Sequence, residues 1–343
     1  MPFISQATLP SIPYRILPGF AHPQLRTVID FSSTSPCAIM KITAVCTAVF
    51  LLGIADLQGA EPTFWDSPDA YLGQPRPSEK PQPFASLLLA DKGTFTMDRI
   101  AFSNDGMEIY YVQNDQFFNL THAKIKSFKY ADRKWSAPKV LNEHFYAPTF
   151  SVNDDALYFM GVNPTKVWQS HRTDDGWSIP AVFLKKPYAL YDFMPTTSGR
   201  CYVGSDAGQG NVTDWNTYKF CVMEGSGATS TIRSLGVPLN EPGFNGDFFV
   251  AKDESFMIVS ANETPAFECE LFISFRRPND TWSKPQSLGP LINDGVAHRW
   301  GEYVTPDDKF LFYSRCTNEK DCAIYWVRFD RLLESLRRSG SEP

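Results

Sequence analysis

The sequence predicts an all-β protein, a β-propeller of five four-stranded blades, and three observations support this prediction. The chain of 343 residues contains 14% aromatic residues, 26 Pro and 21 Gly, a composition that favours short strands and turns over helices. A hairpin pattern recurs five times at intervals of about 50 residues. Each hairpin is followed by further strand segments, so that one unit has the size of a propeller blade.

The N-terminal part precedes the repeats and has a different composition. Residues 1–39 are rich in Pro and Ser and are expected to be a spurious or disordered leader. Residues 40–60 are expected to be a signal peptide, because a short basic start at Met40 is followed by an apolar run and a small-residue end near Ala60. The run, 42–55, is too short to span a bilayer comfortably, so no stable membrane span is expected. The alternatives are an internal strand or a membrane anchor.

Export to the periplasm or the extracellular space would permit disulfides among the five cysteines that follow residue 60. Cys316 and Cys322 bracket a short charged loop and are candidates for such a bond. Cys201 and Cys221 fall on strands that we expect to be neighbours, and Cys269 is left over.

The five hairpins each combine an apolar strand, a turn rich in Asn, Asp, Gly, Ser or Lys, and a strand of β-branched and aromatic residues. They occupy residues 100–112, 148–160, 193–205, 248–260 and 302–314. A Trp-Ser-x-Pro motif follows three of them, at Trp135, Trp177 and Trp282. Because these tryptophans recur with the repeat, we expect them to pack the blades together and not to contact a ligand.

The number of blades follows from where the repeats begin and end. The last unit ends at a third strand, 323–329, and residues 84–91 resemble the outer strand of the other units. We therefore expect an N-terminal strand at 84–91 to complete the last blade, which closes the ring and removes two open sheet edges. Residues 84–329 then hold five blades; six is the alternative, but the Pro-rich segment 61–83 is too short for one. Residues 330–343 are expected to form a short helix and tail.

The hairpin turns carry a resemblance to a known family. The turns S-N-D-G (103–106), T-S-G (197–199) and T-P-D-D (305–308) resemble those of the WD40-like (PD40) repeats of TolB-type β-propellers, which are found in exported bacterial proteins. The segments YLGQPRPSEKPQPFAS (71–86) and IYWVRFDRLLESLR (324–337) resemble an exported bacterial branch of that family. The resemblance implies the propeller fold, and it says little about function because propellers support both binding and catalysis.

The first strand of each propeller blade lines the central channel, so its first residue should lie at one channel mouth. This position is held by Arg99, Ala147, Asp192, Asp247 and Gly301. Its neighbours include Asp98, Tyr146, Tyr191, Arg299, Trp300 and Glu302. We expect these charges to converge, either to bind a polar ligand or to pair with one another and close the channel with salt bridges or water.

Four polar loops should lie at the same mouth: 113–123, 205–217, 260–269 and 314–322. Their aromatic residues would either stack on a sugar or peptide or pack beneath the loops. The predicted ligand-binding residues are Asp98, Arg99, Asp192, Trp215, Asp247, Phe267, Arg299, Trp300 and Glu302.

Two functions fit these features. The first is an exported, non-catalytic, monomeric propeller that binds a protein, a peptide or a cell-envelope glycan through its mouth. The alternative is a glycoside hydrolase, since five-bladed propellers include such enzymes, with Asp192, Asp247 and Glu302 as candidate catalytic carboxylates. No metal-binding motif is present and no cofactor is expected, although clustered carboxylates make Ca²⁺ the alternative. The net charge of -6 argues against binding to nucleic acid.

Overall fold

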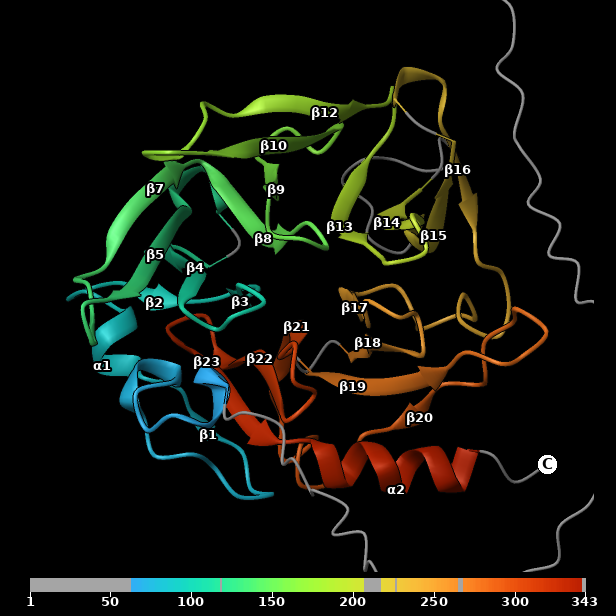
Figure 1. Cartoon of the computed structure of the whole chain (residues 1–343). Helices are drawn as coiled ribbons and strands as arrows, with labels where there is room; N and C mark the ends of the chain where they lie inside the picture. Colours follow the sequence, from blue (N-terminus) through green and yellow to red (C-terminus); the bar gives the residue numbers. More distant parts are fainter. Residues whose placement is uncertain (1–62, 118, 207–216, 226, 265–267, 341–343) are drawn as a thin grey trace, which may run out of the picture. The chain divides into compact units, whose positions relative to one another are not determined.

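The structure is a computed structural model that describes residues 63–117, 119–206, 217–225, 227–264 and 268–340, all within one compact unit. Five antiparallel sheets are arranged around a common centre (Figure 1). The prediction of an all-β, five-bladed propeller is therefore confirmed, and the alternative of six blades is wrong. Neither α-helix in the described part of the chain is both long and apolar enough to cross a membrane.

Blades 1 and 2 have the same order of strands from the channel outwards. Blade 1 comprises β2 (Phe95–Thr96), β3 (Ala101–Phe102), β4 (Glu108–Asn114), β5 (Lys124–Ala131), β6 (Lys134–Trp135) and β7 (Lys139–Glu143). Its inner edge is split, since β2 and β3 both pair with β4. Blade 2 comprises β8 (Phe145–Phe150), β9 (Ala156–Gly161), β10 (Lys166–Thr173), β11 (Gly176–Trp177) and β12 (Ala181–Lys185).

Blades 3 and 4 each follow the simple order of four strands. Blade 3 comprises β13 (Leu190–Pro195), β14 (Cys201–Ser205), β15 (Lys219–Glu224) and β16 (Thr231–Ser234). Blade 4 comprises β17 (Phe248–Val250), β18 (Phe256–Thr264), β19 (Glu268–Phe275) and β20 (Gln286–Ser287). The described loops hold short 3-10 turns, η3 (Leu120–His122) and η5 (Gly227–Thr229).

Every blade begins with a hairpin whose turn has the same geometry. The turn residues with positive φ are Gly106, Asp154, Gly199, Glu254 and Asp308. In each turn the amide of this residue donates to the carbonyl three residues earlier, at 2.8–3.3 Å. Gly and Asp adopt a left-handed conformation at low cost, and this explains why the repeat was visible in the sequence as a series of Gly- and Asp-rich turns.

Blade 5 contains strands from both ends of the described chain. It comprises β21 (His298–Val304), β22 (Phe310–Asn318), β23 (Asp321–Arg328) and β1 (Gln82–Pro83). Closure of the last blade by an N-terminal strand is confirmed, but the strand expected at 84–91 is wrong. Phe84 is fully buried against Phe312 and Trp326, and Ala85 has a φ of 45° that ends the strand. The following residues form the short helix α1 (Ser86–Leu89), in which Leu87 is 97% exposed.

The Pro-rich segment before β1 covers the seam between blades 5 and 1. It contains two 3-10 turns, η1 (Phe64–Asp66) and η2 (Tyr71–Gly73). The Tyr71 hydroxyl donates to Asp307 of blade 5 at 3.3 Å, and the Trp65 indole donates to the Asn104 carbonyl of blade 1 at 3.0 Å. The segment therefore fastens the ring where its ends meet.

The tryptophans of the Trp-Ser-x-Pro motif join neighbouring parts of the fold. Trp177 of blade 2 donates its indole N–H to the Tyr110 hydroxyl of blade 1 at 2.7 Å. Trp282 of blade 4 packs edge-on against Tyr202 of blade 3, with ring centroids 6.2 Å apart. Trp135 donates to the Pro-rich segment. The prediction that these residues pack the blades is confirmed for Trp177 and Trp282, whereas Trp135 joins blade 1 to the Pro-rich segment.

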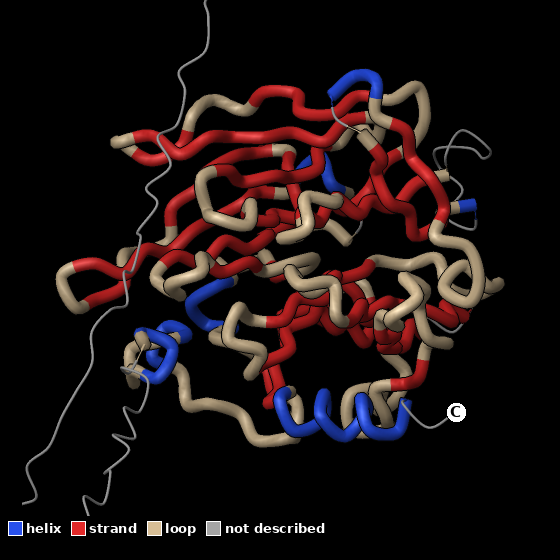
Figure 2. Tube along the Cα trace, turned by 45° about the vertical axis from the view of Figure 1, so that its right-hand side comes forward, coloured by secondary structure: helices blue, strands red, loops and turns tan. Residues whose placement is uncertain are grey.

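The C-terminal helix α2 (Asp330–Gly340) was also predicted and lies on the outside of the sheets, beside β20 (Figures 1 and 2). The Gln286 side chain of β20 donates to the Leu336 carbonyl of α2 at 3.1 Å. Cys316 and Cys322 form the disulfide expected across the β22–β23 turn. Cys201 and Cys221 lie on the paired strands β14 and β15, as expected, and are not in a disulfide.

Candidate functional site

A cavity of about 260 Å³ opens at one end of the central channel. Its lining residues are Met97, Asp98, Leu120, Tyr146, Tyr191, Asp192, Asn245, Gly246, Asp247, Ser260, Cys269, His298 and Trp300. All five blades contribute, and Leu120, Ser260 and Cys269 come from the loops 113–123 and 260–269 or their ends. The predicted meeting of inner-strand residues and loops at one mouth is therefore found in the structure.

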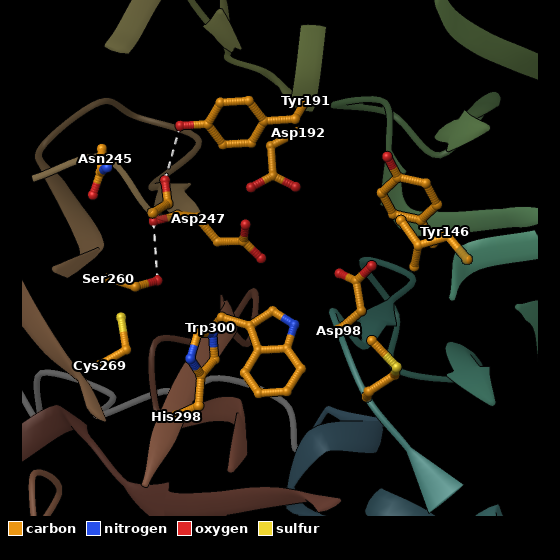
Figure 3. A pocket seen from close by; sticks show the side chains of 13 residues that line it. Asp98, Tyr146, Tyr191, Asp192, Asn245, Asp247, Ser260, Cys269, His298 and Trp300 are labelled. Carbon is orange, nitrogen blue, oxygen red and sulfur yellow. Dashed lines mark hydrogen bonds between the residues drawn. The ribbon is translucent and has the colours of Figure 1, made fainter. Parts of the chain in front are cut away.

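Three carboxyl groups from different blades point into this cavity (Figure 3). Asp192 Oδ2 accepts a hydrogen bond from the amide of Phe248 at 3.3 Å, and Asp247 Oδ2 accepts one from the amide of Gly301 at 3.2 Å. Asp98 Oδ1 accepts one from the amide of Arg99 at 2.6 Å. The bonds to Asp192 and Asp247 run from one blade to the next, so these carboxyls both face the cavity and join the blades.

A repeated irregularity in the inner strands directs the side chains of Asp98 and Asp192. Asp98, Ala147, Asp192 and Gly301 have φ values of 66°, 50°, 47° and 65°. In blades 2, 3 and 5 the strand register shifts at this point, as in a β-bulge. The sequence predicts Arg99 at this position; the structure places Asp98 there, because blade 1 has one more residue before its hairpin turn.

Arg99 crosses the channel beneath the cavity and contacts all four other blades. Its fully buried guanidinium forms an ion pair with Asp192 Oδ2 at 3.0 Å. It also donates to the Phe248 carbonyl at 2.8 Å and to the Thr149 hydroxyl and the Glu302 carbonyl, both at 3.3 Å. The ion pair with Asp192 is the kind of charge pairing that was expected from the sequence as the alternative to ligand binding.

Glu302 lies below the cavity and does not line it. Its side chain is fully buried, and Oε1 accepts a hydrogen bond from the Ser260 hydroxyl at 2.6 Å. Oε2 has no hydrogen-bond partner among the residues that the structure describes. Burial raises the pKa of Glu302 to about 8, against the lowering effect of the Ser260 hydrogen bond.

Burial and mutual repulsion also raise the pKa of two carboxyls in the cavity. Burial, with a further contribution from the charge of Asp192, raises the pKa of Asp98 to about 7, although Arg99 opposes the shift. Burial and the charges of Asp192 and Asp98 raise the pKa of Asp247 well above its ordinary value. Both shifts favour the neutral carboxyl form at pH values where an exposed aspartate is ionised, beside the Arg99–Asp192 ion pair.

Aromatic rings form the walls. The Tyr191 hydroxyl donates to the Gly246 carbonyl at 2.9 Å, and its ring stacks on Tyr218 with centroids 4.7 Å apart. Trp300 meets the His298 ring edge-on at 4.7 Å. These contacts hold both walls in defined positions.

Arg299 was expected to contact a ligand, but in the structure it does not line the cavity. Its guanidinium is buried and donates to the carbonyls of Gly295 and Ala297, both at 3.1 Å, and of Cys269 at 3.3 Å. It therefore supports the loop before β21. Trp215 and Phe267 lie outside the described residues, so the prediction that they contact a ligand stays a prediction.

Several lining residues were not among the predicted set. These are Met97, Leu120, Tyr146, Tyr191, Asn245, Gly246, Ser260, Cys269 and His298, of which the two tyrosines were expected near the mouth but not as ligand contacts. Their only sequence signal is their place at the ends of strands or in the loops assigned to this mouth.

The described residues contain no group of three or more His, Cys, Asp or Glu side chains arranged to hold a metal ion. Binding of Ca²⁺ by the clustered carboxylates therefore stays a prediction from the sequence.

No protein-family model and no curated protein matches the chain. Solved propellers do resemble it, among them TolB from Acinetobacter baumannii, with 11% identity over 66% of this chain and a TM-score of 0.39. The match spans 53% of that TolB, about half its length.

Two solved enzymes are similar to the same degree. CoXyl43, a GH43 β-xylosidase/α-arabinofuranosidase from a compost microbial metagenome, has 11% identity over 74% of this chain and 95% of its own, with a TM-score of 0.45. An oligogalacturonate lyase in complex with manganese has 10% identity over 75% and 100%, with a TM-score of 0.38. Similarity at this level does not assign an activity. By its sheets and hairpin turns, the chain is a five-bladed β-propeller that resembles the TolB-type proteins.

Proposed function

We propose that this protein is an exported propeller that binds a protein, a peptide or a cell-envelope glycan through the cavity at its channel mouth. The observation that supports the proposal best is the cavity itself, where carboxyl groups from blades 1, 3 and 4 meet aromatic side chains from blades 2, 3 and 5. A concave site with apolar walls and a few fixed polar groups is the usual form of a ligand site in proteins.

The site also has the rigidity that binding requires. Asp192 and Asp247 are held by amides of the next blade, and Tyr191 is held by the Gly246 carbonyl. Side chains that are already ordered lose little conformational entropy when a ligand arrives.

The Cys316–Cys322 disulfide supports the proposed export, because disulfides persist in oxidising compartments. The net charge of -6 supports a partner other than nucleic acid. We propose that the protein is a monomer.

The test is retention of the full chain on peptide and glycan arrays, compared with Trp300→Ala and Asp247→Asn. Both changes should reduce retention at least about tenfold, since each removes a group that faces the cavity. Asp174→Asn is the matched control, because Asp174 is exposed in the β10–β11 turn. If both cavity variants bind as well as the control, the cavity is not the site.

A glycoside hydrolase is the second candidate, favoured by the unequal environments of the carboxyls. Asp192 is ion-paired with Arg99, whereas burial raises the pKa of Asp98 to about 7 and raises that of Asp247 well above its ordinary value. One ionised and one protonated carboxyl are what a base or nucleophile and an acid need.

Release of reducing ends from a set of polysaccharides tests this candidate. Asp192→Asn and Asp247→Asn should each lower the rate by at least about a hundredfold. If the unaltered chain releases nothing, or the variants release as much, this candidate fails and binding stands alone.

A further inference from the structure

The chemistry of the cavity narrows the class of ligand that can bind there. We infer that the cavity receives the side-chain ammonium of a lysine presented by a partner protein. This inference rests on the proposed binding function and specifies its partner.

The size and walls of the cavity fit one extended side chain. Its volume of about 260 Å³ lies just below the range of about 300–1,000 Å³ in which proteins hold drug-sized ligands. Met97, Leu120 and Trp300 line it with apolar surface, while Asp98 and Asp247 supply acidic groups. A lysine side chain has two matching parts, an apolar stem of four carbons and a charged ammonium at its end.

Among the described residues, Asp192 is the one carboxyl in the cavity with a cationic partner, Arg99, whereas Asp98 and Asp247 have none. Three carboxyls point into the space, and no lysine or arginine is among its described lining residues. Arg99, beneath the cavity, is already committed to four blades through Asp192, Thr149 and two carbonyls. An incoming cation would give Asp98 and Asp247 a positively charged partner, favour their ionised forms and form charge-assisted hydrogen bonds with them.

A buried acceptor below the cavity adds an independent observation. Glu302 is fully buried and its Oε2 has no hydrogen-bond partner among the described residues. Its other oxygen, Oε1, accepts a hydrogen bond from Ser260, which lines the cavity. A further carboxyl therefore lies next to the cavity, and a cation bound there would favour its ionised form.

The arrangement favours an ammonium over other cations and over a sugar. Three carboxyls approach from blades 1, 3 and 4, which matches the three N–H donors of an ammonium better than the planar fork of a guanidinium. The rings of Tyr146, Tyr191 and Trp300 add surfaces on which a cation is attracted. A neutral sugar carries no positive charge with which these carboxyls could pair.

The inference is tested by calorimetric titration of the full chain with three probes at about pH 6, where all amino groups carry most of their charge. Nα-acetyl-lysine amide should bind at least about tenfold more tightly than Nα-acetyl-norleucine amide, which has the same stem without the ammonium. Glucosamine represents an amino sugar and should bind more weakly than the lysine probe. Asp247→Asn and Trp300→Ala should each weaken lysine binding, whereas Asp174→Asn should not.

Proton release gives a second readout on the unaltered chain. A bound ammonium should ionise neutral carboxyls, so the heat of binding should differ between buffers of different ionisation enthalpy. The charged or titratable groups that face these carboxyls are Arg99 on the β2–β3 segment, Tyr146 on β8, Tyr191 on β13, and Glu302 and His298 on β21. Binding without proton release would contradict the inference.

The remaining outcomes separate this inference from the proposed function. Equal binding of the lysine and norleucine probes, or tighter binding of glucosamine, would overturn the lysine assignment and leave a binding cavity. Array retention that depends on Trp300, without any binding of the lysine probe, would do the same. If neither the arrays nor the probes detect binding in the cavity, both proposals fail.

Discussion

Arg99 Nη2 of blade 1 lies 3.0 Å from Asp192 Oδ2 of blade 3, across the centre of the ring. Both side chains are at least 97% buried, and the same guanidinium also reaches blades 2, 4 and 5. One side chain thus fixes the spacing of all five blades below the cavity. The shape of the cavity depends on this contact, although Arg99 does not line it.

Loss of this contact should destabilise the fold strongly. Arg99→Met leaves Asp192 buried without its partner, and breaking a buried ion pair in this way costs about 3–5 kcal/mol. Chemical denaturation should show a free energy of unfolding reduced by this amount. The exposed pair Arg233–Glu224 provides the control, since Arg233→Met should change stability by about 1 kcal/mol or less. Equal effects of the two changes would contradict the role given to Arg99.

The raised carboxyl pKa values predict that stability falls as pH rises. In the unfolded chain these groups ionise near pH 4, but in the folded protein the pKa is about 7 for Asp98 and about 8 for Glu302. Between these limits the folded state binds more protons than the unfolded state, so the free energy of unfolding decreases from about pH 4 to about pH 8. Asp98→Asn and Glu302→Gln keep the neutral form and should flatten this slope in denaturation series at several pH values.

Glu254 provides the matched control for pH dependence. Burial would raise its pKa, but hydrogen bonds from Ser198, Thr196 and Tyr202 together lower it to about 2. Its contribution is present above the unfolded pKa and is lost only as pH falls below about 4. Glu254→Gln should therefore lower the free energy of unfolding without altering its slope between about pH 5 and pH 8. If Asp98→Asn and Glu302→Gln also leave this slope unchanged, the raised pKa values of Asp98 and Glu302 are refuted.

Close contact between blades 5 and 1 predicts a specific requirement for glycine. A Cβ on Gly301, where φ is 65°, would lie 2.5 Å from the carbonyl carbon of Asp98 and 2.9 Å from the amide of Arg99. Gly289 also has a positive φ, of 88°, but nothing lies within 4 Å of a Cβ there. Gly289→Ala should cost about 1 kcal/mol from backbone strain alone, and Gly301→Ala clearly more. Thermal melts that give the two variants the same midpoint would disprove the close contact.

The disulfide at the mouth should stabilise the fold modestly. It closes a short loop, for which the chain-entropy relation gives roughly 2 kcal/mol. Cys316 and Cys322 also pack with Met97 and Trp300, so their loss should loosen one wall of the cavity. Cys316→Ser with Cys322→Ser should lower the melting temperature and weaken ligand retention. Cys201→Ser breaks no disulfide and should change neither the melting temperature nor ligand retention. If the double variant has the same melting temperature and retention as Cys201→Ser, the disulfide does not stabilise the mouth.

The blades could be predicted because their signals are local. Each hairpin reverses at a residue such as Gly106 or Asp154, whose chemistry is readable without knowledge of the rest of the fold. Strand β1 gave no such signal, since Gln82 and Pro83 become a strand only by pairing with Trp326 and Tyr325. The run of leucines that follows looked more like a strand, yet most of it remains exposed.

The site was predicted in outline but not in detail. Asp98, Asp192, Asp247 and Trp300 were placed correctly at the mouth, because the repeat locates the start of each inner strand. The left-handed backbone conformation of Asp98, between β2 and β3 of blade 1, is not readable from the sequence. Alternation along a strand could have indicated that the neighbours Arg299 and Trp300 face opposite sides, so that only one of them reaches the cavity.

The central claim is that the cavity at the channel mouth is the binding site. The most direct test is the dissociation constant of an array-selected ligand, measured by titration for the unaltered chain, Trp300→Ala, Asp247→Asn and the control Asp174→Asn. We expect both cavity variants to bind at least about tenfold more weakly while melting as folded proteins, with the control unchanged. Equal dissociation constants for all four proteins would show that the ligand binds elsewhere.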